Sequence, residues 1–166
     1  MYYPIHLNLL DMNIVVIGAG HIAARKCQIF CEYNKPVSVV SPQFCDFFLS
    51  RAHLFQLVTD HYQPSYIAQS QLVIAATNDP AVNRQIATDC KARGILVNVA
   101  DSAELSSFIV PAYVKRGDLL LSVSTSGKDP ATTKRIKHEL EQTYSLFDTE
   151  RLAQLGTERA TRKGVS

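Results

Sequence analysis

The sequence predicts a protein of the α/β class built on a doubly wound parallel sheet, and three observations carry that prediction. Short β-branched runs alternate with amphipathic segments of helical period, which is the pattern of a parallel sheet covered on both faces. A glycine-rich string stands directly between the first strand and the first helix. The 166 residues are 46% hydrophobic and 19% charged, with a formal net charge of +2, so collagen-like, disordered and small disulfide-rich classes are excluded.

The first half of the predicted sheet begins with a strand, a helix and a second strand. Asn13–Ile17 is a short β-branched run, which favours a buried strand. His21–Tyr33 repeats apolar residues on one face, which predicts a helix. A turn through Asn34–Pro36 then leads to a second strand at Val37–Val40, so one strand–helix–strand unit is complete.

The pattern then repeats. Further strands are predicted at Phe55–Val58, Leu72–Ala76 and Leu96–Val99, with a helix at Pro80–Arg93. Asp79 offers an N-cap side chain before a proline at the first helical position, and Gly94 offers the stop. Residues 1–112 are therefore predicted to form one doubly wound domain.

The alternation ends after this domain. Phe108–Val114 and Leu119–Ser124 are two extended runs joined by a turn-rich link, which predicts an antiparallel hairpin. A helix from Asp129 to Tyr144 and a last polar helix over Asp148–Arg162 follow. Because a hairpin and a helix bury little apolar surface alone, residues 113–144 are predicted to form a homodimerisation segment, with residues 145–166 as a helical tail.

Gly18-Ala19-Gly20-His21-Ile22-Ala23 matches G-x-G-x-x-A, the dinucleotide-binding pattern of Rossmann-like folds. The first glycine permits the tight turn and the second lets a pyrophosphate approach the backbone, where helix N–H groups can bind it. Polar residues at the ends of the second and fourth strands are placed to touch the same cofactor. The residues expected to contact it are Gly18, Gly20, His21, Ile22, Ser41, Pro42, Gln43, Thr77 and Asn78.

Two positions leave alternatives open. Ser41 stands where an acidic residue usually binds the ribose hydroxyls, so the choice between NAD and NADP does not follow from charge, and Ser41 itself is either a ribose contact or a turn cap. Asp101 leaves the fifth strand at the same edge of the sheet. It is either a general base or hydrogen-bond partner, or the N-cap of residues 102–105.

Charge and cysteine usage narrow the choice of partners. Residues 113–138 hold six Lys or Arg against two Asp or Glu, which favours an anionic partner such as a polycarboxylate or a nucleic acid, or else a solvated helix face. The near-neutral net charge of the whole chain speaks against a nucleic-acid partner.

The cysteines form no CxxC pair, so reduced, buried thiols are expected and no metal site. No signal core or membrane-spanning run is present, so no membrane partner and a cytoplasmic location are expected.

Motifs along nearly the whole chain resemble one known family. They are Tyr3–Ile5, Val15–Ala23 with Arg25 and Lys26, Val39–Pro42, Ala75–Asp79 with Val82 and Asn83, Asn98–Val99 with Asp101, Ser107–Ala112, and Ser122–Lys128 with Pro130. In order and spacing they are similar to the siroheme synthase N-terminal family, the precorrin-2 dehydrogenases, some of which are also sirohydrochlorin ferrochelatases.

The resemblance implies NAD-dependent oxidation of precorrin-2, a tetrapyrrole, to sirohydrochlorin by a homodimer, with ferrochelatase activity as a further possibility. By position, Asp101 matches the family's catalytic acidic residue. The resemblance and the basic segment together indicate substrate binding by Thr125, Lys128, Lys134 and Arg135. The alternative is a dimeric module that senses NAD(H) without catalysis; the basic segment and Asp101 favour the enzyme.

Overall fold

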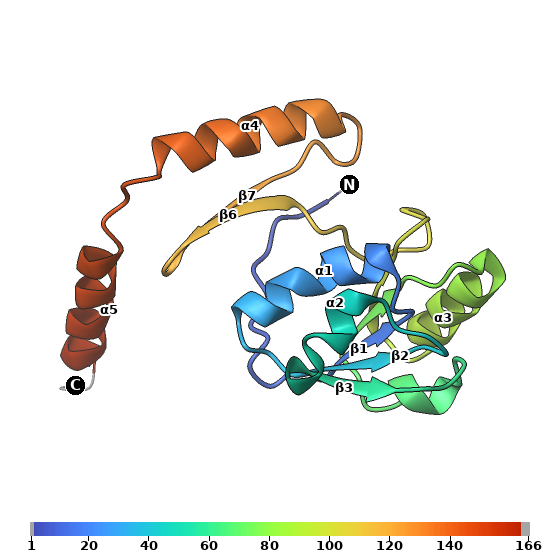
Figure 1. Cartoon of the computed structure of the whole chain (residues 1–166). Helices are drawn as coiled ribbons and strands as arrows, with labels where there is room; N and C mark the ends of the chain where they lie inside the picture. Colours follow the sequence, from blue (N-terminus) through green and yellow to red (C-terminus); the bar gives the residue numbers. More distant parts are fainter. Residues whose placement is uncertain (1, 164–166) are drawn as a thin grey trace. The chain divides into compact units, whose positions relative to one another are not determined.

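The computed structural model describes residues 2–163, and the chain divides into two compact units on either side of the Ile109–Val110 bond (Figure 1). The first unit holds a five-stranded sheet in the order β3-β2-β1-β4-β5. Its strands are β1 Ile14–Ile17, β2 Val37–Val40, β3 Phe55–Val58, β4 Leu72–Ala75 and β5 Leu96–Val99. All of its strand pairs are parallel, so the predicted fold class is confirmed.

Helices cover both faces of this sheet. Helices α1 His21–Glu32 and α2 Asp46–Leu49 pack with one set of strand residues, and α3 Pro80–Ala92 packs with the other set. Successive residues of each strand alternate between the two sets: Val16 faces α1, whereas Val15 and Ile17 face α3. This two-sided burial explains why the strands are continuously apolar in sequence.

The residues predicted to begin and end the helix at Pro80–Arg93 have these roles in the structure. Asp79 accepts hydrogen bonds from the N–H groups of Ala81 (2.8 Å) and Val82 (3.4 Å), and so caps α3. Gly94 follows the helix with a φ of +68°. Helix α2 and two short 3-10 segments, Ala52–Leu54 and Pro64–Ile67, were not predicted, because three or four residues carry no readable period.

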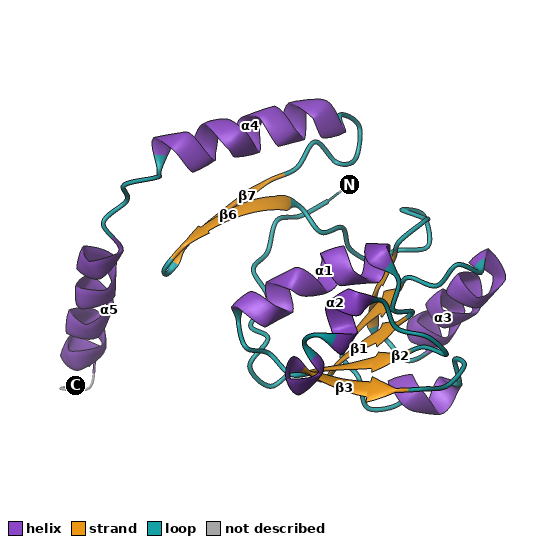
Figure 2. Cartoon of the chain, in the orientation of Figure 1, coloured by secondary structure: helices purple, strands orange, loops and turns teal. Residues whose placement is uncertain are grey.

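The second unit holds an antiparallel hairpin of β6 Ala112–Arg116 and β7 Leu119–Val123, followed by helices α4 Pro130–Thr143 and α5 Thr149–Lys163. Helix α4 packs on the hairpin, chiefly on β6 (Figure 2). The antiparallel hairpin and both helices were predicted. Among the described residues, no helix has the length and apolarity needed to cross a bilayer.

The predicted bounds of the first hairpin strand were wrong. The strand begins at Ala112 rather than Phe108, and the turn is confined to Gly117 and Asp118. Residues before it are held by β5 instead: the Ser107 hydroxyl accepts the Val97 N–H (2.8 Å), and the Asn98 side chain donates to the Phe108 carbonyl (3.0 Å). These bonds fix the chain beside β5.

Candidate functional site

A cavity of about 840 Å³ opens at the carboxyl ends of β1, β2 and β4. The strand order reverses between β1 and β4, and such switch points are where open α/β sheets bind their ligands. Eight of the nine predicted cofactor residues line the cavity: Gly18, Gly20, His21, Ser41, Pro42, Gln43, Thr77 and Asn78. The ninth, Ile22, is not among the lining residues and is 52% exposed.

The two glycines of the first turn differ in what they do. Gly18 has a φ of +99°, and a Cβ built there would lie 2.3 Å from the Ala76 carbonyl oxygen, so only glycine fits. Gly20 has an ordinary backbone, and a Cβ there would meet no atom within 4 Å. The space beside Gly20 is therefore a place where a ligand can approach the backbone.

Helix α1 begins directly at this space. Gly20 is its N-cap, and the Gly20 carbonyl accepts the first helical hydrogen bond from the Ala24 N–H (2.9 Å). The N–H groups of the first turn, from His21 to Ala23, have no intrahelical partner in any α-helix. Together with the helix dipole they form an anion-binding position, which suits a pyrophosphate.

At the end of β2, the Ser41 hydroxyl donates to the Gln43 carbonyl (2.7 Å), and the side chain is buried. This bond closes the turn, as the turn-cap interpretation requires. Ser41 also lines the cavity, so its oxygen keeps a position beside a bound ligand. Pro42 and Gln43 continue the same wall without adding a charge.

Asn83 joins the two loops that carry predicted site residues. Its side-chain oxygen accepts from the Thr77 N–H (3.1 Å) and the Thr77 hydroxyl (2.8 Å). Its amide nitrogen donates to the Thr77 carbonyl and to the Asp101 carboxylate (both 3.2 Å). One buried side chain therefore positions both a cavity-lining loop and the exposed carboxylate after β5.

Sequence reasoning did not assign Asn83 a role. The readable signal was a polar residue on the buried face of α3, whose other buried residues are Ile86, Ala87 and Cys90. In the turn that follows Asp101, the Leu105 N–H donates to the Ser102 hydroxyl (3.3 Å). The Asp101 carboxylate accepts from the Asn83 side chain (3.2 Å), and among the described residues it accepts no N–H of residues 102–105.

Acidic and aromatic residues that the sequence analysis passed over also line the cavity. Asp60, His61 and Tyr62 follow β3 and form part of its wall. The Asp60 carboxylate accepts from the hydroxyl of Tyr66 (2.5 Å) and from the side chain of Gln63 (2.9 Å). Hydrogen bonds from Tyr66 and from the His61 N–H lower the pKa of Asp60.

The four predicted substrate residues all lie in the second unit. Thr125 forms the loop before α4: its hydroxyl accepts the Asp129 N–H (3.0 Å). Lys128 and Lys134 are exposed, and Arg135 forms an ion pair of 2.6 Å with Glu139 one turn further along α4. Asp129 caps α4 by accepting the Thr132 N–H (2.9 Å), so its carboxylate has a structural role.

All four cysteines are free thiols, as predicted. Cys27 and Cys90 are buried, and desolvation raises the pKa of Cys27 to about 12 and that of Cys90 to about 11. The expectation of full burial was wrong for Cys31 and Cys45, which are partly buried and pack against the edge of the core that α1 and α2 cover. Within residues 2–163, no group of three His, Cys, Asp or Glu side chains could hold a metal ion.

Comparisons with known proteins agree with this geometry. A family model described as "Putative NAD(P)-binding" matches residues 5–112. The chain is 34% identical to a siroheme synthase of Chromobacterium violaceum and 37% identical to one of Nitrosospira multiformis, in each case over 84% of the chain. It spans only about a third of those relatives, 30% and 31% of their length.

Among solved structures, the chain is similar to one described as SirC, precorrin-2 dehydrogenase. The TM-score is 0.75 with 27% sequence identity, covering 89% of this chain and 72% of that one. The resemblance to siroheme synthases stated from the motifs is thereby confirmed. The matched family model spans the whole sheet and every residue of the cavity wall, and the chain belongs to this NAD(P)-binding family.

Proposed function

We propose that the protein is an NAD-dependent dehydrogenase that oxidises precorrin-2 to sirohydrochlorin in siroheme biosynthesis. The observation that carries this proposal is the cavity at the switch point, where Gly20 leaves open space in front of the first turn of α1. Similarity to a solved precorrin-2 dehydrogenase over 89% of the chain supports the substrate.

The residues present fit a dinucleotide. A Cβ at Gly20 would project into the open space, and the N–H groups of the first turn of α1 point to where a pyrophosphate would bind. Thr77 and Asn78 are proposed to hold the nicotinamide half at the end of β4, and Ser41 to Gln43 the adenosine half at the end of β2. When bound, NAD+ supplies the acceptor for a hydride.

Asp101 is proposed to accept the proton that accompanies the hydride, or to orient the macrocycle. Asn83 donates to one of its oxygens and leaves the other free to take a proton. Asp101→Ala is expected to lower kcat by about a hundredfold, since general acid–base groups typically contribute about 10²–10⁴. The Kd for NAD+ should stay within about twofold, because Asp101 is not among the cavity-lining residues.

Steady-state kinetics measures the fall in kcat, and calorimetry measures the Kd for NAD+. Glu104→Ala, which removes a nearby exposed carboxylate, is the matched control and should change neither quantity. An unchanged kcat in Asp101→Ala would contradict the assignment.

The cations of the second unit are proposed to bind the carboxylates of precorrin-2. Lys128 and Lys134 are the exposed candidates, with Thr125 as a hydroxyl donor. Arg135 is held by Glu139 and would have to leave that ion pair to bind substrate. A homodimer in the cytoplasm, formed through residues 113–144, completes the proposal.

Metal insertion into sirohydrochlorin is the further activity that the resemblance to siroheme synthases suggests. Adding ferrous or cobaltous ion to the product tests it. A chelatase accelerates metal insertion over the protein-free rate, whereas a dedicated dehydrogenase does not.

A further inference from the structure

We propose that Asp60, at the end of β3, makes the protein select NAD+ against NADP+. The inference rests on the proposed cofactor cavity and adds to it the residue that reads the adenosine ribose. In most folds of this kind an acidic residue at the end of the second strand binds the ribose hydroxyls, whereas here that place belongs to Ser41.

The sheet register brings Asp60 to the same edge as Ser41. Strands β2 and β3 run parallel with Val40 paired to Val58, and the Ser41 N–H donates to the Val58 carbonyl (3.1 Å), which extends the pairing by one residue. Asp60 follows two residues after Val58. It lines the same cavity as Ser41 and Gln43.

The end of β2 carries no charge of its own. The Ser41 hydroxyl donates its proton to the Gln43 carbonyl, and neither Pro42 nor Gln43 is ionisable. Of the two acidic side chains that line the cavity, Asp60 follows β3, the strand beside β2, whereas Asp79 follows β4. Asp60 supplies the carboxylate that the usual position lacks.

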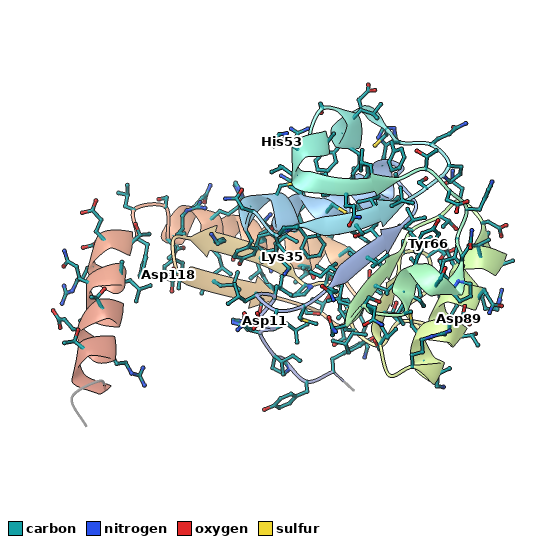
Figure 3. The ribbon with its side chains drawn as sticks, turned by 90° about the horizontal axis from the view of Figure 1, so that it is seen from below. Asp11, Lys35, His53, Tyr66, Asp89 and Asp118 are labelled. Atoms are coloured by element: carbon teal, nitrogen blue, oxygen red, sulfur yellow. The ribbon has the colours of Figure 1, made fainter. Side chains whose placement is uncertain are left out.

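The side chain of Asp60 is held in place. One carboxylate oxygen accepts from Tyr66 and Gln63, and within residues 2–163 the other accepts only the His61 N–H (2.7 Å). A carboxylate oxygen can accept two hydrogen bonds, so the second oxygen keeps room for a ribose hydroxyl. Tyr66, which fixes this geometry, is labelled in Figure 3.

The charges around the cavity act against a 2′-phosphate. The lining residues of the described chain include no lysine or arginine, and their acidic members are Asp60 and Asp79. Asp79 caps α3 through one carboxylate oxygen and follows β4, which is two strands away from β2 in the sheet. Hydrogen bonding lowers the pKa of Asp60, so it is ionised at neutral pH. A 2′-phosphate would meet a carboxylate with no lysine or arginine among the lining residues to offset it, whereas a ribose hydroxyl could donate to that carboxylate.

Calorimetric titration of the full chain with NAD+ and with NADP+ tests the proposal. The wild-type protein is expected to bind NAD+ at least about tenfold more tightly than NADP+. Asp60→Asn should reduce that ratio by about tenfold, chiefly by tightening NADP+ binding, because the repelling charge is gone. Asp60→Glu keeps the charge and should keep the preference for NAD+.

Two further variants separate the charge from the shape of the turn. Tyr66→Phe removes a bond that orients Asp60 but leaves its carboxylate, and should retain most of the discrimination. Asp89→Asn makes the same chemical change at a carboxylate that also accepts from a tyrosine, Tyr62 (2.8 Å), but does not line the cavity. Figure 3 labels Asp89. The ratio of NAD+ to NADP+ affinity in Asp89→Asn should equal that of the wild type.

Three results would overturn the role of Asp60. They are an unchanged ratio in folded Asp60→Asn, an equal loss in Asp60→Asn and Tyr66→Phe, and a wild-type protein that binds both nucleotides equally. Circular dichroism establishes folding of each variant. A wild-type protein that binds neither nucleotide would instead overturn the proposed cofactor site, and this inference with it.

Discussion

A substitution at Gly20 is expected to affect cofactor binding but not folding. Gly20→Val is expected to abolish NAD+ binding, because the new side chain occupies the open space in front of α1. Its backbone φ of −84° is ordinary for any residue, so the unfolding free energy should change by less than about 1 kcal/mol. Fluorescence titration and thermal denaturation measure the two effects.

Gly18→Ala is the contrasting control. Its Cβ would lie within 3 Å of the Ala76 carbonyl group and the Thr77 nitrogen, so this variant should be destabilised by several kcal/mol. Undiminished NAD+ binding by Gly20→Val would contradict the placement of the pyrophosphate.

Asn83→Ala should impair catalysis more than cofactor binding. The truncation leaves the Thr77 N–H and the Asp101 carboxylate without their partner, and an unmade buried hydrogen bond costs about 1–3 kcal/mol. We expect kcat to fall about tenfold, since misplacing a reacting group is costly. The Kd for NAD+ should rise less than kcat falls.

Kinetics and urea unfolding check both parts. Thr88→Ala, on the exposed side of the same helix, is the control and should stay within about 0.5 kcal/mol of the wild type. If Asn83→Ala loses stability but keeps its kcat, Asn83 is structural and does not position Asp101.

The residues that could be predicted from sequence are those whose role is set by a local motif. Gly18 and Gly20 follow from a turn that any such strand–helix connection requires, and both line the cavity. Asn83 and Asp60 could not be predicted in the same way. Their roles depend on partners 18 residues away in one case and on a neighbouring strand in the other.

At the scale of elements, the strands were predictable because burial on two faces leaves a continuous apolar run. Leu72–Ala75 is fully buried along its length and was found to within one residue. Helix α2 was missed because its four residues, Asp46–Leu49, hold no helical period, although its Phe48 is completely buried. Phe48 packs edge-on against Phe55 of β3, with ring centroids 5.1 Å apart, a contact that only tertiary structure creates.

The hairpin and α4 together form an element that lacks a complete core. Helix α4 has no buried residue, and Val114 is the one fully buried hydrophobic residue among the described positions of the hairpin. A surface of this kind is expected to be covered by a second copy, since two strands and a helix are marginal alone. Light scattering over a dilution series should therefore give a dimer at micromolar concentration, and a monodisperse monomer there would contradict the assignment.

In the molecule as a whole, only some of the cations counted in residues 113–138 remain available to a ligand. Arg135 and Lys137 are tied to Glu139 and Glu141 along α4, which reduces the field that the six cations of residues 113–138 would otherwise produce. The sequence could count these charges but not their pairing, because pairing at i and i+4 depends on rotamers. Lys128 and Lys134 stay exposed.

An anaerobic assay with precorrin-2 distinguishes a dehydrogenase from a protein that only binds NAD(H) in the cavity of the first unit. Precorrin-2 and NAD+ are mixed anaerobically with the protein, and NADH and sirohydrochlorin are followed together by absorbance, with Gly20→Val as the blank. The two products are expected to rise in equal amounts with the wild-type protein and not with the variant. If NAD+ binds to the wild-type protein but no NADH forms with authentic precorrin-2, the dehydrogenase assignment is contradicted and a sensor of NAD(H) becomes the better description.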